Sequence, residues 1–323
     1  MTETEIASGS VDDLAEAVST ADALVRSVGL TVRGKDDVVR LAVVALLAGG
    51  HLLVEDQPGT GKTLLAKSLA ASIGGTFGRV QCTPDLLPGD LTGTTVYSPA
   101  DGTWTFRPGP LFANVVLVDE VNRASPRTQS ALLEPMEERQ VSADGTTHPL
   151  PDPFFCIATQ NPFGQVGTFP LPESQLDRFG LVVTVGYPDL SAEREILTGH
   201  GGTDRFGDLH PVTTPEALAR VVAAVRTTYV AAPLVDYVLD LAAATRVHPG
   251  ISVGASPRAS MSLLRAAQAH AVVEGRDFAT PDDVQAVLGP AWAHRISTGG
   301  TVDTGVGRTV LAELVVSRPV PRP

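Results

Sequence analysis

A glycine-rich segment near residue 60 combines residue types that bind phosphate. It follows a short apolar strand, predicted at 52–54, and it opens a predicted helix. Backbone N–H groups at the start of such a helix, together with the helix dipole, attract anions. Lys62 adds a positive charge beside the β- and γ-phosphates, and the Thr63 hydroxyl can ligate Mg²⁺. The predicted nucleotide-binding residues are Gln57, Pro58, Gly59, Thr60, Gly61, Lys62, Thr63 and Leu64.

The segment departs from the strict Walker A pattern at its first position. That pattern begins with glycine, and Asp56 stands there instead. A chance glycine-rich turn that opens a helix is therefore the alternative. The strand before the loop and the helix after it favour a phosphate loop, so ATP or ADP with Mg²⁺ are the predicted cofactors.

Two adjacent carboxylates at the end of a predicted buried strand form the second chemical feature. Residues 115–118 are all apolar, and Asp119 and Glu120 follow at the carboxyl edge, where parallel sheets bind ligands. Because side chains alternate along a strand, the two carboxylates can face different targets. Asp119 is predicted to hold Mg²⁺ through water, and Glu120 to polarise the attacking water as a general base. Helix capping is the weaker alternative, since Ser125-Pro126 already supplies a cap.

A third predicted strand end brings an amide to the same edge of the sheet. Residues 154–158 are apolar and lead into Thr159-Gln160-Asn161. An amide at this place could orient the attacking water, so Asn161 joins the predicted catalytic residues. An ordinary turn at Asn161-Pro162 is the alternative.

Two arginines on predicted helices complete the catalytic set. Arg258 lies in the first turn of its helix, where a cation opposes the macrodipole unless an anion such as phosphate faces it. Arg178 lies on a short helix that Leu176 and Phe179 can anchor to the core. This leaves Arg178 free to serve a neighbour's nucleotide as an arginine finger. A tolerated surface arginine and an ordinary surface salt bridge are the alternatives.

Length, charge and cysteine content limit the classes of function. The 323 residues allow two domains, and the net charge of −12 disfavours nucleic acid, which needs a basic surface. Cys82 and Cys156 fall in predicted buried strands, as expected of reduced thiols. The spacing of the histidines does not match a zinc site. The longest apolar run is too short to cross a bilayer. The acidic N-terminal residues are unlike those of a signal peptide. We expect a cytoplasmic protein without membrane insertion.

The pattern of apolar residues divides the chain into an α/β part and a helical part. Short apolar runs predict strands of a parallel sheet at 52–54, 79–82, 115–118, 154–158 and 181–185. A hairpin is predicted at 94–106. Helices are predicted at 11–28, 36–47, 192–197, 215–229, 234–247, 257–274 and 281–296. The predicted units are an N-terminal tail and helix (1–28), an α/β core (29–188), a helical domain (189–316) and a loose tail (317–323).

Several longer stretches of the chain are specific enough to carry a family resemblance. They are residues 55–63, 83–88, 109–114, 119–124 with 128–133, 137–141, 158–162, 171–179 and 255–259. Together they resemble the MoxR family of AAA+ ATPases, over about residues 30 to 300. That family commonly carries Glu-Asp at the positions of Glu55-Asp56, and it usually carries alanine where this chain has Pro135. A proline inside a helix bends it, so the placement of Glu137 and Arg139 stays open.

The resemblance implies both a fold and roles for individual residues. The fold would be an AAA+ P-loop core with a five-stranded parallel sheet, a hairpin inserted in its second helix, and a following all-α lid domain. Asn161 would be sensor 1, Arg178 the arginine finger and Arg258 sensor 2. Residues 32–34 would lie on the adenine side of the site.

The resemblance also implies a function. MoxR proteins look like ATP-driven chaperones that mature partner complexes, often by inserting metals or cofactors, and they often act with von Willebrand factor A domain proteins. They resemble other AAA+ proteins in forming hexameric rings, which suits a trans-acting arginine, because head-to-tail contacts that close give cyclic symmetry. The alternatives are an ATP-dependent binding switch or scaffold with little turnover and a nucleic-acid-associated AAA+ motor. A small-molecule P-loop kinase is least favoured, since it needs neither a lid arginine nor a finger.

Overall fold

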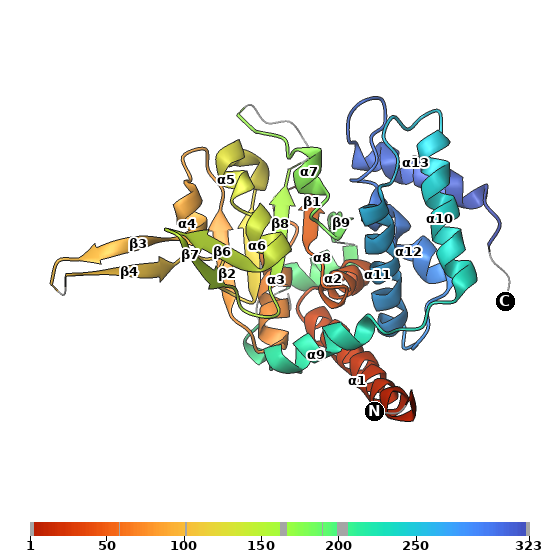
Figure 1. Ribbon diagram of the computed structural model, residues 1–323, viewed down its shortest axis with the longest axis horizontal. Coiled ribbons are helices and arrows are strands. Elements are labelled where there is room, and N and C mark those ends of the chain that lie inside the picture. The colour runs from red at the N-terminus through yellow and green to blue at the C-terminus, as the bar shows by residue number, and fades with distance from the viewer. Residues whose placement is uncertain are drawn as a thin grey trace.

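The computed structural model describes residues 3–57, 59–100, 102–161, 167–188, 190–198 and 206–320. Pro58, one of the predicted nucleotide-binding residues, lies outside these ranges. Figure 1 shows an α/β part with a hairpin projecting from one side and a group of helices on the other side. Within the ranges described, no helix combines the length and the apolar character needed to cross a membrane.

Five parallel strands form the central sheet of the α/β part. They are β1 (Leu52–Glu55), β2 (Phe77–Gln81), β5 (Val115–Asp119), β8 (Phe155–Gln160) and β9 (Leu181–Val183), in the order β2-β5-β8-β1-β9. Each predicted strand is present with slightly shifted bounds, and the parallel pairing confirms the predicted α/β core. Because β5, β8 and β1 are neighbours, the segments that follow them meet at one edge of the sheet.

Both faces of this sheet are covered by hydrophobic side chains. Successive residues of β5 belong alternately to two core clusters, and all of them are buried, as the sequence predicts for a central strand. One cluster continues into α2 (Asp36–Leu47) and α3 (Lys62–Ser72). Cys82 and Cys156 belong to the other cluster as buried free thiols, in agreement with the expectation of reduced cysteines.

Helix α1 is longer than the sequence pattern predicts. It spans Glu3–Gly29, whereas the helical spacing of apolar residues begins only near residue 11. Helix α1 packs against α2 and α3 of the α/β part and against α9 (Pro215–Val225) and α11 (Pro257–Val273) of the helical part. These contacts join the two parts of the molecule through one continuous hydrophobic core.

Two β-hairpins stand beside the central sheet, and the sequence pattern predicts one of them. Strands β3 (Gly93–Ser98) and β4 (Thr103–Pro108) form the predicted hairpin, which projects from the molecule (Figure 1). Strands β6 (Gln140–Ala143) and β7 (Thr146–Pro149) form the second hairpin. Its turn contains Asp144 at φ 49° and Gly145 at φ 77°, the backbone of a type I′ turn. The Asp-Gly dipeptide is the sequence signal for this second hairpin.

Short helices lie in the connections between strands of the α/β part. They are α4 (Pro88–Thr92), α5 (Pro126–Ser130), α6 (Leu133–Glu138) and α7 (Glu173–Leu176). The Ser125 Oγ accepts the Thr128 N–H at 3.3 Å, which confirms Ser125 as the cap of α5. Pro135 lies in the first turn of α6. A backbone N–H in the first turn of a helix has no partner within that helix, so the missing N–H of Pro135 removes no hydrogen bond and does not bend α6.

Six helices form the helical part among the described residues. They are α8 (Leu190–Leu197), α9, α10 (Ala232–Val247), α11, α12 (Pro281–Trp292) and α13 (Thr304–Val316), of which α13 is not predicted from the sequence. Its cap is Asp303, whose Oδ1 accepts the N–H groups of Gly305 and Val306. A Cβ at Gly307 would lie 2.8 Å from the Ala293 carbonyl oxygen, so glycine permits close packing there. These glycines weaken the helical signal of the sequence.

Candidate nucleotide-binding site

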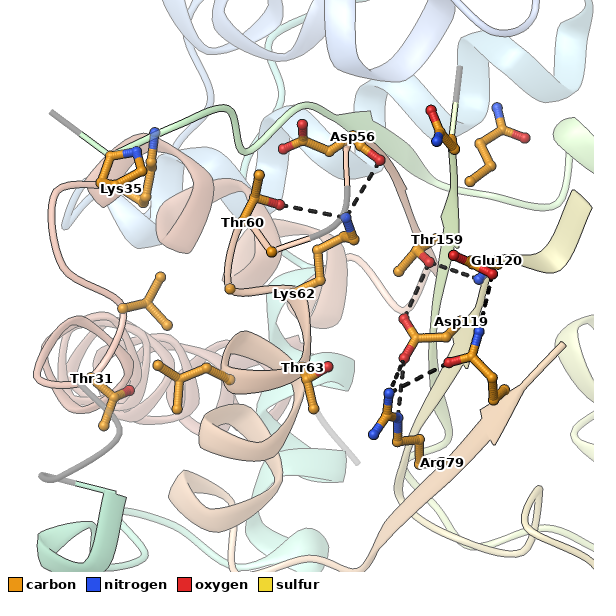
Figure 2. A pocket seen from close by; sticks show the side chains of 18 of the residues that line it. Thr31, Lys35, Asp56, Thr60, Lys62, Thr63, Arg79, Asp119, Glu120 and Thr159 are labelled. Atoms are coloured by element: carbon orange, nitrogen blue, oxygen red, sulfur yellow. Dashed lines mark hydrogen bonds and ion pairs between the residues drawn. The ribbon is translucent and has the colours of Figure 1, made fainter. Parts of the chain in front are cut away.

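A cavity of about 510 Å³ lies at the carboxyl edge of the central sheet, in the size range of small-molecule sites. The loop before α3, the ends of β5 and β8, and the segment between α1 and α2 line it (Figure 2). The predicted site residues in its lining are Gly59, Thr60, Gly61, Lys62, Thr63, Leu64, Asp119, Glu120 and Asn161. The structure therefore brings the predicted phosphate loop, the carboxylate pair and the amide together.

The loop before α3 has the open backbone that a phosphate needs. Gly59 (φ 87°) and Gly61 (φ 92°) have the left-handed conformation that favours glycine. No described atom lies within 4 Å of the place where a Cβ at either position would be. Gly61 is the N-cap of α3, so the first N–H groups of this helix lie at the cavity. This arrangement fits the binding of an anion.

The Lys62 ammonium group is folded back onto its own loop. Its Nζ donates to the Gln57 carbonyl oxygen. It also lies 3.4 Å from both the Asp56 carbonyl oxygen and the Thr60 Oγ1 (Figure 2). Burial lowers the pKa of Lys62, and the nearby carboxylates only partly offset this effect. A half-buried ammonium group held by neutral oxygens gains from an anion. Lys62 is therefore placed to exchange carbonyl oxygens for phosphate oxygens.

Asp119 ends β5, and both of its carboxylate oxygens have partners. Its Oδ2 accepts hydrogen bonds from the Arg79 Nε at 3.1 Å and from the Arg79 Nη2 at 2.9 Å. Its Oδ1 accepts the Thr159 hydroxyl at 3.2 Å. The neighbouring strands β2 and β8 therefore hold the carboxylate in one orientation at the cavity wall. The sequence pattern singles out neither Arg79 nor Thr159, because both read as ordinary strand residues.

Glu120 follows at φ 54°, and its carboxylate has other partners than that of Asp119. Its Oε2 accepts hydrogen bonds from the Gln81 Nε2 at 3.2 Å and from the Arg123 Nη1 at 2.8 Å. The Glu120 N–H donates to the Thr159 Oγ1 at 2.9 Å. Thr159 thus contacts both acidic residues and fixes them relative to each other. The Glu120 side chain is 31% exposed, so a water molecule can reach it.

Asn161 and the segment between α1 and α2 close two further sides of the cavity. Asn161 directly follows β8, and its carbonyl oxygen accepts the Asn122 Nδ2 at 3.2 Å. Thr31, Val32 and Arg33 line the cavity, and Thr31 lies on the side away from Asp119 and Glu120 (Figure 2). Val32 is buried and gives this wall an apolar surface, which suits a nucleotide base.

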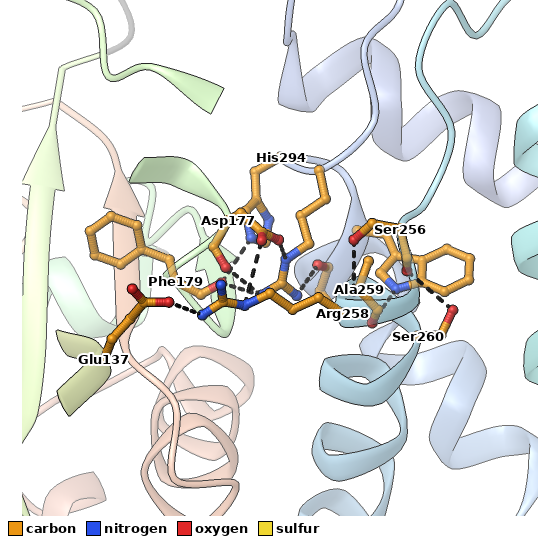
Figure 3. Close-up of polar contacts among 11 residues, drawn as sticks. Glu137, Asp177, Phe179, Ser256, Arg258, Ala259, Ser260 and His294 are labelled. Carbon is orange, nitrogen blue, oxygen red and sulfur yellow. Dashed lines mark hydrogen bonds and ion pairs between the residues drawn. The ribbon is translucent and has the colours of Figure 1, made fainter. Parts of the chain in front are cut away.

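The two predicted arginines do not lie at this cavity. Neither Arg178 nor Arg258 is among the described residues that line it. Both guanidinium groups bind Glu137 instead. The distance is 2.8 Å from Arg178 and 2.6 Å from Arg258, the contact that Figure 3 shows. The Arg258 Nε also lies 3.5 Å from the Asp177 Oδ2. Carboxylates therefore face Arg258 in this structure, and its contact with phosphate stays a prediction. The ion pair of Arg178 matches the salt-bridge alternative, and its role as an arginine finger stays a prediction.

Both arginines line a second cavity, of about 530 Å³, between the α/β part and the helical part. The arginines of this groove are Arg139, Arg178, Arg226, Arg258, Arg265 and Arg295, and its acidic residues are Glu137 and Asp177. Burial lowers the pKa of Arg226, and the charges of Arg265 and Arg139 lower it further. On a chain with a net charge of −12, this groove is a concentrated positive surface. Such a surface favours an anionic partner.

Comparison with known proteins establishes the class. Residues 51–181 match the family described as ATPase family associated with various cellular activities (AAA), and residues 243–313 match the AAA lid domain. A crystal structure of a candidate ATPase from Cytophaga hutchinsonii superimposes with a TM-score of 0.86 at 31% identity, covering 98% of this chain and 99% of that chain. The matched families and the fold are those of an AAA ATPase, an enzyme that binds and hydrolyses ATP.

Relatives that share most of their length with the chain establish the family. Chaperone MoxR1 of Mycobacterium tuberculosis is 40% identical over 305 residues, 89% of this chain and 78% of that protein. Protein MoxR of Paracoccus denitrificans is 34% identical over 289 residues, 82% of this chain and 85% of that protein. YeaC of Bacillus subtilis is 45% identical over 263 residues, 81% of this chain and 82% of that protein. The chain belongs to the MoxR family of AAA+ ATPases, which confirms the resemblance found in the sequence.

Proposed function

We propose that this ATPase uses ATP hydrolysis to remodel or mature a partner protein complex in the manner of a chaperone. The single cavity that joins Lys62, Asp119, Glu120 and Asn161 carries the catalytic part of the proposal. The relative named Chaperone MoxR1 supports the remodelling part. Insertion of a metal or cofactor into the partner complex is the finer form of the same proposal.

In this proposal the residues of the chain divide the hydrolysis among them. Backbone N–H groups of residues 59–63 and the Lys62 ammonium group bind the phosphates. Glu120 accepts a proton from the attacking water as general base, and Asn161 orients that water. Thr63 and Asp119 present the hydroxyl and carboxylate oxygens that Mg²⁺ prefers. Mg²⁺ held there would neutralise charge on the phosphates.

Arg178 and Arg258 serve the nucleotide of a neighbouring copy in this proposal. Both lie in the arginine-lined groove and outside their own nucleotide cavity. An arginine on one surface that completes a site on a different surface requires head-to-tail contacts, and such contacts close into rings. A hexameric ring is the proposed assembly. On binding, the phosphates of the neighbour's ATP would compete with Glu137 for the two guanidinium groups.

The proposed partner is a von Willebrand factor A domain protein or another client complex. Nucleic acid is not expected, because a net charge of −12 opposes binding to a phosphate backbone. The cytoplasm stays the predicted location of the protein.

Glu120→Gln tests the catalytic part of the proposal. Glutamine keeps the size of the side chain but cannot act as the base, so ATP should still bind with a Kd within about threefold of the wild type, while phosphate release falls by about 10²- to 10⁴-fold. Isothermal calorimetry and a phosphate-release assay measure the two quantities. Glu313→Gln, at an exposed position of α13, is the matched control and should leave turnover unchanged. Normal turnover by Glu120→Gln would refute the assignment.

The same variant tests the remodelling part, because it should stay in the ATP-bound state. It is used as bait in an extract of the cells that make the protein, with ATP or with ADP. A protein complex retained with ATP and released with ADP is the expected result. Equal recovery with both nucleotides would contradict an ATP-driven remodelling role and leave the ATPase assignment standing.

A further inference from the structure

Glu55 and Asp56 form a structural junction at the head of the phosphate loop, where the strict Walker A pattern has glycine in place of Asp56. Glu55 ends β1 and Asp56 follows it directly. Asp56 is only 8% exposed, although it carries a carboxylate. The catalytic scheme proposed above uses neither side chain. Their contacts point to a different role.

Asp56 holds the segment that leads from the sheet to the helical domain. Its Oδ2 accepts the Gly186 N–H at 2.6 Å, and its Oδ1 accepts the Gln57 N–H at 2.7 Å. Bonds from N–H groups to an ionised carboxylate are about twice as strong as neutral ones. Gly186, at φ 67°, follows β9 and precedes α8. Asp56 therefore ties the phosphate loop to the start of the helical domain.

Two further contacts bind the same segment beside the nucleotide cavity. The Tyr187 hydroxyl donates to the Gln57 Oε1, and the Lys35 Nζ donates to the Tyr187 carbonyl oxygen. Lys35 and Pro188 themselves line the nucleotide cavity. The head of the phosphate loop, residues 186–188 and the cavity wall thus share one network of hydrogen bonds.

Glu55 reaches the other end of the helical domain. Its Oε2 accepts the Thr304 hydroxyl, and its Oε1 accepts the Gln160 Nε2 at 2.7 Å. Thr304 is the first residue of α13, and Gln160 is the last residue of β8, directly before Asn161. The Glu55 carboxylate therefore links three elements. They are β1, before the phosphate loop, β8, which leads into Asn161, and α13.

We propose that the Glu55–Asp56 pair couples occupancy of the phosphate loop to both ends of the helical domain, an inference that rests on the proposed function. Lys62 binds the carbonyl oxygens of Asp56 and Gln57 in this structure. A triphosphate that takes over Lys62 releases these carbonyls, and residues 56–57 then move with the groups that their side chains hold. A glycine in place of Asp56 would offer no acceptor to the Gly186 N–H, so it would remove the link between the phosphate loop and residues 186–188.

Hydrogen exchange of the backbone amides tests this coupling, with and without a nonhydrolysable ATP analogue. In the wild type, the analogue should change the amide exchange rates of residues 184–187 and of the first turn of α13 by about threefold or more. Asp56→Gly restores the strict Walker A pattern, so it should still bind the analogue. The amides of its residues 184–187 should exchange faster and no longer respond to the analogue. Glu55→Ala should lose the response at α13 and keep that at Gly186.

Asp56→Asn is the second variant, because asparagine keeps the side-chain shape and avoids the extra backbone freedom of glycine. It loses the charge and one acceptor oxygen, so its response at Gly186 should be reduced. A wild-type response in both Asp56 variants would overturn the coupling. Loss of analogue binding in both would overturn it too, because Asp56 would then serve the loop itself. A wild type that binds no analogue would instead overturn the proposed function, and this inference with it.

Discussion

Arg258 lies outside its own nucleotide cavity and shares Glu137 with Arg178. If both arginines complete a neighbour's site, Arg258→Ala removes a charge from every interface of a uniform ring. Phosphate release should then fall by about 10³-fold or more, the usual effect of losing an arginine finger. Glu120→Gln should be similarly inactive, because every site lacks its base.

Mixing the two inactive variants separates action within a chain from action between chains. A complete site needs Glu120 in its own subunit and Arg258 in the neighbour, and each condition is met with a chance of one half in an equal, random mixture. About one quarter of the sites are therefore complete, and phosphate release should recover to about one quarter of the wild-type rate per site. If Arg258 served its own chain, no subunit of the mixture would hold both Glu120 and Arg258, and phosphate release would not recover.

Co-expression or prolonged mixing allows the subunits to exchange before phosphate release is measured. Lys62→Ala mixed with Glu120→Gln is the control, because both changes affect the same cavity and no mixture can complete it. Arg178→Ala mixed with Glu120→Gln should recover like Arg258→Ala. A mixture of Arg258→Ala and Glu120→Gln that stays at the level of the control would refute the placement of Arg258 between subunits.

Buried polar groups give further expected outcomes. Burial lowers the pKa of His51 to about 4. Between pH 6.5 and 4 the unfolded chain therefore binds more protons than the folded chain, and the free energy of unfolding should fall by about 3 kcal/mol as the pH drops through this window. Denaturant titrations of His51→Gln should lack this loss. Asp283 is fully buried against Arg276, and Asp283→Ala should cost about 3–5 kcal/mol in chemical denaturation. Thr159→Val removes the hydroxyl that contacts Asp119 and the Glu120 N–H, so kcat should fall by about tenfold to a hundredfold while the Kd for ATP holds. A parallel loss of ATP affinity would show that Thr159 supports binding instead.

The phosphate loop and the central strands can be predicted from the sequence because their signals are local. An apolar run such as 115–118 needs burial on both faces wherever it lies in the fold. Residues 57–64 combine a glycine loop with the first turn of a helix, so their geometry is set by neighbours in the chain. The hairpin turn at Asp144-Gly145 belongs to the same class of signal, since its backbone conformation depends on those two residues.

The partners of the arginines depend on contacts between distant parts of the chain. The helical signal around Arg258 shows only that its first turn needs an anion, and phosphate and carboxylate meet that need equally well. The tertiary structure brings Arg258 of α11 to Glu137 of α6, which lies 121 residues earlier. Arg79 and Thr159 likewise join the site only because β2, β5 and β8 are neighbours in the sheet. The sequence by itself thus determines the chemistry that each segment can offer, whereas the tertiary structure decides which segments meet, because electrostatic contacts depend on distance in space and not along the chain.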